Sequence, residues 1–192
     1  MFTSFQRRDL VLCLLLAGLM FATRGHHFAS ALHLPDASNA IFFLAGFLLS
    51  PALALPLLLL EAMGIDYVAI TWGGVSSFCV SPAYLLLLPS FGTLWLAGRW
   101  CGKRFAAGTG HFAAYAGAAL LATAIAELLA SGGFYFFSGR FAEPNFAGLL
   151  SRLVTYAPPV FASAALWLGL AALLHLALAA RRRAKDRDGL AG

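Results

Sequence analysis

The sequence predicts an all-α integral membrane protein with six transmembrane helices. Its composition, its apolar runs and the placement of its charges each favour this fold class. Of the 192 residues, 61% are hydrophobic and only 11% are charged, whereas a soluble domain carries roughly 25% charged residues. The apolar residues fall in long runs, and one membrane-spanning helix needs about 20 of them. The length therefore suits a single bundle of five or six spans.

The first predicted helix covers about residues 7–23. It has a basic start and no clean A-x-A cleavage site after it, so we expect a retained helix rather than a cleaved signal peptide. The polar loop RGHHFASALHLPDASN follows, and then the run IFFLAGFLLSPALALPLLLL, which Ser50-Pro51 interrupts. This run is either one kinked span or two short helices, because serine followed by proline is typical of a helix start.

The basic residues decide between five and six helices. A turn at Ser50-Pro51 gives six helices with both termini cytoplasmic, and ten of the 13 lysines and arginines then lie inside. These ten are Arg7, Arg8, Arg99, Lys103, Arg104, Arg181, Arg182, Arg183, Lys185 and Arg187. A five-span chain would place one basic end on the wrong side of the positive-inside rule. Because the basic residues sit at chain ends and in one loop, they do not indicate nucleic-acid binding.

The other helices are predicted from the remaining apolar runs. The third should continue past Glu61 towards Ile70, since each half of the broken run is too short for a core of about 30 Å. The last three are expected over about residues 81–99, 111–130 and 147–180. We expect a bend at Pro89, a helix end at Gly132-Gly133 and a kink at Pro158-Pro159. A basic cytoplasmic tail covers about residues 181–192.

Unusual polar residues gather in the loops that face outward in this topology. The loops are residues 24–38, 61–80 and 131–150. The polar residues are His26, His27, Asp36, Glu61, Asp66, Cys79, Glu143 and, just beyond the last loop, Arg152. Small-molecule pockets are mostly apolar with a few polar groups, so this grouping predicts a pocket open to the outside. The alternative is an ordinary interfacial belt of polar and aromatic residues.

Cys79, in SSFCVSPAY, is the sharpest single feature of the chain. Ser81-Pro82 is typical of a helix start, which would put Cys79 within a turn of a helix N-terminus, where partial positive charge favours thiolate. A thiolate is a nucleophile and a soft ligand for transition metals. The alternative is a small hydrophobic residue packed among helices. The other two cysteines are far away, so no disulfide framework or zinc cluster is predicted.

Several other residues are candidates for ligand contact, each with an ordinary alternative. His27 offers an imidazole to a metal or ligand, or is simply solvated. Asp66 lies among apolar residues, where a carboxylate is costly, and either contacts a ligand or pairs with Arg152. Tyr84 follows the cysteine by over one helical turn and either reaches the same cavity or sits in the interfacial belt. Glu127 either bonds a ligand or caps a polar contact between helices.

The chain resembles the BtuM family, the small solitary substrate-binding (S) components assigned to cobalamin uptake among energy-coupling-factor (ECF) transporters. The resemblance covers nearly the whole chain. It rests on six helices, on RGHHF, on GIDYVAITWGG and, most specifically, on SSFCVSPAY. It implies an S-component-like bundle in a bacterial inner membrane, in which residues 1–192 form one transmembrane substrate-binding domain.

The resemblance implies that cobalamin (vitamin B12) is captured in a pocket facing the periplasm. Cys79 matches the cysteine that ligates the corrin's cobalt and removes cyanide from cyanocobalamin. The polar pocket residues of the family are matched by His27, Asp66, Tyr84 and Arg152. The implied partners are the lipid bilayer and an ECF module of two ATPases and a transmembrane coupling subunit. The family often carries Ala-x-x-x-Ala on its first helix for docking, and the nearest pattern here runs from Gly18 to Ala22.

Corrin chemistry agrees with a solitary cysteine. Cobalt(III) in a corrin already holds four equatorial nitrogens, so the protein needs to offer one axial donor.

Three alternative functions stay open. One is an S component for another vitamin, with Cys79 incidental. The second is a membrane thiol oxidoreductase, which the wide cysteine spacing disfavours, and the third is a structural or sensory membrane domain without a small ligand.

Overall fold

The computed structural model describes residues 6–24, 34–105 and 112–188, apart from the side chains of Cys79, Phe105 and residues 182–188. All regular elements in these ranges are helical, and no strand occurs among them. The α-helices are α1 (Arg7–Arg24), α2 (Ser38–Leu48), α3 (Ala54–Thr71), α4 (Leu87–Phe105), α5 (Phe112–Glu127), α6 (Gly133–Phe137) and α7 (Phe146–Asp188). Two 3₁₀ turns, Ser77–Cys79 and Pro82–Leu86, precede α4, and the π-helical turn Leu128–Gly132 joins α5 to α6.

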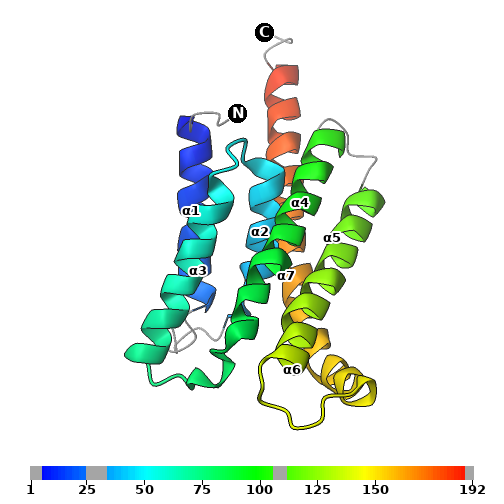
Figure 1. Ribbon diagram of the computed structural model, residues 1–192. Helices are drawn as coiled ribbons and strands as arrows, with labels where there is room; N and C mark the ends of the chain where they lie inside the picture. The colour runs from blue at the N-terminus through cyan, green and yellow to red at the C-terminus, as the bar shows by residue number, and fades with distance from the viewer. Residues whose placement is uncertain (1–5, 25–33, 106–111, 189–192) are drawn as a thin grey trace.

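The long helices run alternately in opposite directions along one bundle (Figure 1). α1, α3 and α5 run one way, while α2, α4 and α7 run back. The start of α1 and the end of α7 therefore lie at the same end of the molecule. We call the other end, where α1 and α3 finish and α2, α4 and α7 begin, the polar end.

Three helical segments of the described ranges are long and apolar enough to cross a membrane. They are Ala54–Thr71, Phe112–Phe137 and Phe146–Arg181. α1 is as long as the first of these but begins with Arg7 and Arg8 and ends with Arg24. These segments indicate a membrane protein, as the composition predicts.

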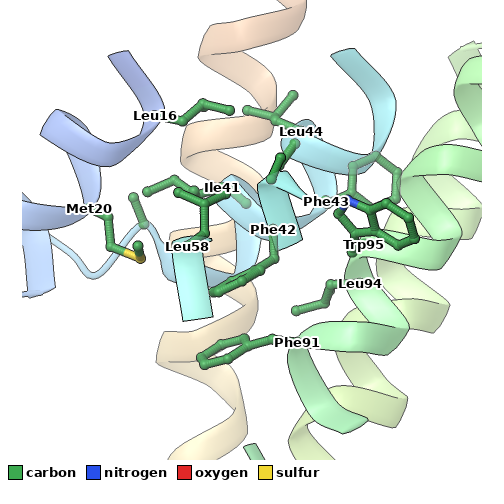
Figure 2. Close-up of a cluster of buried hydrophobic side chains, with 14 of the residues drawn as sticks. Leu16, Met20, Ile41, Phe42, Phe43, Leu44, Leu58, Phe91, Leu94 and Trp95 are labelled. Carbon is green, nitrogen blue, oxygen red and sulfur yellow. The ribbon is translucent and has the colours of Figure 1, made fainter. Parts of the chain in front are cut away.

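α2 is the centre of the hydrophobic core (Figure 2). Phe42 and Phe43 are fully buried, and the Phe42 ring stacks on Phe91 of α4 at 4.2 Å between centroids. Met20 of α1 and Leu58 of α3 complete the contacts around it. A helix that is apolar on every side is stable only when other helices surround it, which explains why the shortest of the long helices is also the most enclosed.

Glycine residues, which carry no side chain, allow α2 and α4 to approach closely. A Cβ atom on Gly98 would lie 1.9 Å from the Phe43 carbonyl oxygen, and one on Gly46 would lie 2.0 Å from that of Trp95. Gly102, four residues after Gly98, also faces α2 at close range. Glycines at this spacing are typical of close helix contacts in membrane proteins.

The predicted break at Ser50-Pro51 is confirmed, because α2 ends at Leu48 and α3 begins at Ala54. Arg99 of α4 stabilises the break: its guanidinium donates hydrogen bonds to the carbonyl oxygens of Leu49 at 3.2 Å and Ser50 at 2.9 Å. A helix leaves its last carbonyls unpaired, and Arg99 satisfies two acceptors just past that end. The expected continuation of the third helix past Glu61 is also confirmed.

The predicted start of the fourth helix near residue 81 is wrong for the α-helix, which begins at Leu87. Ser81 and Pro82 do open a helical turn, but it is a five-residue 3₁₀ turn, and the Ser81 side chain makes no capping hydrogen bond. Pro89 explains the shift. Proline lacks the N–H that an interior helical residue donates, so it fits the first turn and not the middle of a helix.

The predicted helix end at Gly132-Gly133 is also wrong. Both residues have helical backbone angles, and the helix continues as α6 to Phe137. The glycine at 133 serves packing instead, because a Cβ there would lie 2.2 Å from Cδ1 of Leu86. The last predicted helix is confirmed as α7, which keeps Pro158 and Pro159 inside a continuous helix.

The close approach of α2 and α4 gives a test of the fold. Gly98→Ala should lower the stability of the purified protein by about 1–3 kcal/mol, since the added methyl group must push the helices apart. Gly92→Ala, in the same helix, is the matched control, because a Cβ there meets nothing within 4 Å. The control should be neutral or stabilising by up to about 1 kcal/mol. Thermal unfolding in detergent measures both, and equal melting temperatures would contradict the packing described.

Candidate functional site

A bidentate ion pair lies at the polar end. Arg24, the last residue of α1, donates from Nε to Oδ1 of Asp66 at 2.8 Å and from Nη2 to Oδ2 at 2.7 Å. Its Nη1 donates to the Ser38 hydroxyl at 3.0 Å. The Arg24 side chain is only 12% exposed and that of Asp66 24%. The pair therefore joins the end of α1 to α3 and to the first residue of α2.

Tyr84 joins the same carboxylate. Its hydroxyl donates to Oδ2 of Asp66 at 2.7 Å. The structure thus brings together two of the residues that the sequence predicts as ligand contacts. The Asp66 carboxylate accepts hydrogen bonds from Arg24 and from Tyr84 at the same time. The alternative in which Asp66 pairs with Arg152 is wrong, since Arg24 occupies both carboxylate oxygens.

Arg152, on α7, has a different set of neighbours. Its guanidinium carbon lies 4.8 Å from the ring centroid of Phe141, 5.1 Å from that of Tyr156 and 5.8 Å from that of Tyr135. Its Nε is buried and has no hydrogen-bond partner among the described residues. Arginine stacks well on aromatic rings, and these rings hold the guanidinium in place.

Arg24 is not among the residues that the sequence predicts as ligand contacts. It is one of the three basic residues that the predicted topology places outside. The signal that could have found it is the cost of Asp66, because a carboxylate at the end of an apolar helix needs a partner. In the predicted topology the first and third helices end on the same side of the membrane, so Arg24 is as available to Asp66 as Arg152 is.

The backbone of Cys79 closes the 3₁₀ turn Ser77–Cys79, and its side chain is not among the described atoms. Residues on both sides of it are held by contacts. The Val80 carbonyl accepts from Nη2 of Arg140 at 3.4 Å. The Phe78 ring lies 5.3 Å from the guanidinium carbon of Arg140 and 5.7 Å from the Phe134 ring. The turn is therefore tied to α6 and to the connection that follows it.

The helix-dipole argument for a Cys79 thiolate does not hold in its predicted form. The α-helix that was to supply the dipole begins at Leu87, eight residues after Cys79. Between them lies only the short 3₁₀ turn Pro82–Leu86, in which too few peptide dipoles align to build a strong end charge. His27, the other metal-ligand candidate, lies outside the described residues.

Two further carboxylates belong to the polar end. Asp36 accepts from the backbone N–H of Ser38 at 2.9 Å and lies 3.8 Å from Nη1 of Arg24. Glu127, the last residue of α5, is 7% exposed and accepts from the Ser131 hydroxyl one turn later. Glu127 thus makes a local polar contact within its own continuous helical segment, Phe112–Phe137.

A cavity of about 410 Å³ opens between these carboxylates. α1, α4, α5 and α7 and the segment that starts α2 all contribute to its wall, which includes Arg24, Asp36, Asn39, Phe91 and Glu127. This volume falls in the range of ordinary small-molecule pockets, about 300–1,000 Å³. Of the outward-facing polar residues that the sequence predicts around a pocket, Asp36 lines this cavity, whereas Glu61, Asp66, Glu143 and Arg152 do not.

The described side chains include no group of three or more His, Cys, Asp or Glu residues that could hold a metal ion. In comparisons with known proteins, no family model matches the chain and no curated protein matches it. The resemblance to the BtuM family therefore stays a prediction from the quoted motifs.

The ion pair gives a second test. Asp66→Asn takes the bidentate anion from the Arg24 guanidinium and leaves it only the longer contact with Asp36, so the free energy of unfolding should fall by roughly 2 kcal/mol or more. Glu143→Gln removes a carboxylate from an exposed position and should change stability by less than about 0.5 kcal/mol. Denaturant unfolding in detergent measures the free energy of unfolding of both variants and of the natural chain. A loss for Asp66→Asn as small as that of the control would show that the pair does not hold the polar end together.

Proposed function

We propose that the protein is a membrane-embedded binding component that captures cobalamin at its polar end, with the Cys79 thiolate as an axial ligand of cobalt. One observation carries the proposal. The hydrogen bond between Tyr84 and Asp66 closes the chain segment that contains Cys79. Two predicted contact residues thus stand at the two ends of the segment that bears the predicted cobalt ligand.

A restrained turn suits a single metal donor. The flanks of Cys79 are held by Arg140 and by the ring contact of Phe78 with Phe134. A donor that is already positioned loses little conformational entropy on binding. Because four corrin nitrogens surround cobalt before it arrives, one such donor is enough.

Aromatic side chains beside the turn support a broad, flat ligand. Phe134 contacts Phe78 at 5.7 Å and Phe141 at 5.9 Å between ring centroids. Tyr135 continues the group, 4.7 Å from Phe141. A corrinoid with its nucleotide is too large for the 410 Å³ cavity alone, so it would lie across the polar end against these rings.

Removal of cyanide would be a ligand exchange at cobalt. The Cys79 sulfur donates an electron pair to form the Co–S bond, while the Co–CN bond breaks and cyanide leaves with its own pair. Cobalt keeps its +3 state, and the released cyanide takes a proton from water. Any enzymatic character of the protein would be this one step, secondary to binding.

The orientation that we propose has six membrane helices, both termini in the cytoplasm and the polar end facing the periplasm of a bacterial inner membrane. Lys103 and Arg104 end α4 at the end opposite the polar end, and Arg181 lies towards the end of α7. This distribution follows the positive-inside rule. α2, at 11 residues or about 16 Å, would be shielded from lipid by its neighbours.

Uptake would need an energising partner. The Gly18 and Ala22 positions on α1 are exposed, and a Cβ on Gly18 would meet nothing within 4 Å. A face of small residues lets a foreign helix approach closely. It supports docking of the transmembrane subunit of an ECF module, with its two ATPases, on this face.

A binding component for a different vitamin is the second candidate, and the size of the cavity favours it. A volume of about 410 Å³ encloses a ligand of ordinary small-molecule size. In that case Cys79 would have no metal to bind. A membrane thiol oxidoreductase is less suited to the chain, because Cys101 is fully buried in α4 near the end opposite the polar end.

The visible spectrum of bound cobalamin tests the cobalt–thiolate bond. The full chain, purified in detergent and mixed with cyanocobalamin, should shift the corrin absorption bands as sulfur replaces the axial ligand. Cys79→Ala should abolish the shift. Cys13→Ala, which alters a half-buried cysteine of α1, is the matched control and should keep it. A shift that survives Cys79→Ala, or no binding at all, would refute the cobalamin proposal.

A further inference from the structure

The cavity at the polar end is lined by more carboxyl groups than cationic groups. Three charged residues line it: Arg24, Asp36 and Glu127. The Arg24 charge is already matched by both oxygens of Asp66, at 2.7 and 2.8 Å, and Asp36 forms a longer ion pair with the same guanidinium, 3.8 Å from Nη1 to Oδ2. One guanidinium therefore serves Asp66 and Asp36 together, and Glu127 adds a third carboxylate with no further cation among the described residues of the cavity wall.

Glu127 is the more costly of the two carboxylates in the cavity wall. It is 7% exposed, lies in the apolar helical segment Phe112–Phe137 and has no ion-pair partner among the described residues. Its one hydrogen bond in the described part of the chain comes from Ser131. Burying a carboxylate is strongly unfavourable unless a cation or several donors compensate it. One hydroxyl leaves most of this cost uncompensated, and the carboxylate borders an open cavity.

The rest of the wall suits an organic ligand rather than a bare ion. Leu87, Ala126, Ala130 and Val160 supply apolar surface, and Phe91 supplies an aromatic ring. Asn39 adds a side-chain amide that makes no hydrogen bond to the described residues. A volume of about 410 Å³ is far larger than one monovalent cation, and aromatic rings attract organic ammonium groups.

We propose that this cavity is a binding site for a small organic cation, with an ammonium group facing Glu127 and Asp36 and an apolar body against α4 and α7. The site is separate from the Cys79 turn, since none of residues 76–81 lines it. It goes beyond cobalamin capture and would exist whether or not the protein binds a corrinoid.

A pair of probes that differ mainly in charge tests the proposal. Benzylammonium and benzyl alcohol share the same ring, and each is titrated into the full-length protein in nanodiscs, without any corrinoid. Saturation-transfer NMR measures both affinities. Benzylammonium should bind about tenfold more tightly or better, because hydrogen bonds to a charged partner are the stronger kind. Equal affinities for the two probes would overturn the proposal.

Matched variants locate the site. Glu127→Gln keeps the shape of the side chain and should remove the preference for benzylammonium, whereas Glu143→Gln, an exposed carboxylate outside the cavity, should keep it. Ala130→Leu fills the cavity without changing charge and should weaken benzylammonium binding by a similar factor. If Glu127→Gln fails to fold, the Ala130→Leu variant alone tests whether benzylammonium binds in this cavity. A preference that survives Glu127→Gln, or unchanged binding in Ala130→Leu, would show that the cation binds elsewhere.

Discussion

The ion pair between Arg24 and Asp66 is the interaction on which the polar end depends. Two charges at the edge of an apolar bundle are tolerated only because each satisfies the other. Through Ser38 and Tyr84 the pair also reaches α2 and the segment before α4. It therefore fixes where the chain re-enters the bundle after Cys79, because Tyr84 at the end of that segment is bonded to Asp66.

The core and the site are linked through α2. This helix is short and enclosed, and it approaches α4 closely enough to require glycine at Gly46 and Gly98. Its first turn lies at the polar end, where Trp167 of α7 donates a hydrogen bond to the Pro35 carbonyl at 3.0 Å. The tight α2–α4 contact and the looser contact with α7 leave room between them. The cavity occupies that room, so its position follows from the packing of α2.

The apolar runs predict the helix order, because they are local signals. At Ser50-Pro51 the local sequence allows a break or a kink, and the distribution of basic residues along the whole chain favours the break. The errors arose where tertiary contacts reassign a residue. Gly133 reads as a helix end but makes room for Leu86. In the site, Asp66 and Tyr84 were recognisable as costly or well-placed polar groups. The cost of Asp66 indicates that it needs a partner, but the sequence does not decide between Arg24 and Arg152 or predict the hydrogen bond from Tyr84, since these depend on which helix ends become neighbours.

Cobalt K-edge X-ray absorption is the most direct measurement of the central claim, that the held segment between Asp66 and Tyr84 presents a sulfur ligand to cobalt. The full-length protein would be loaded with cobalamin and compared with the Cys79→Ser variant, whose side chain has nearly the same size. The account predicts a sulfur scatterer in the first shell of cobalt in the natural chain and none in the variant. A first shell of only nitrogen, oxygen or carbon in the natural chain would contradict it.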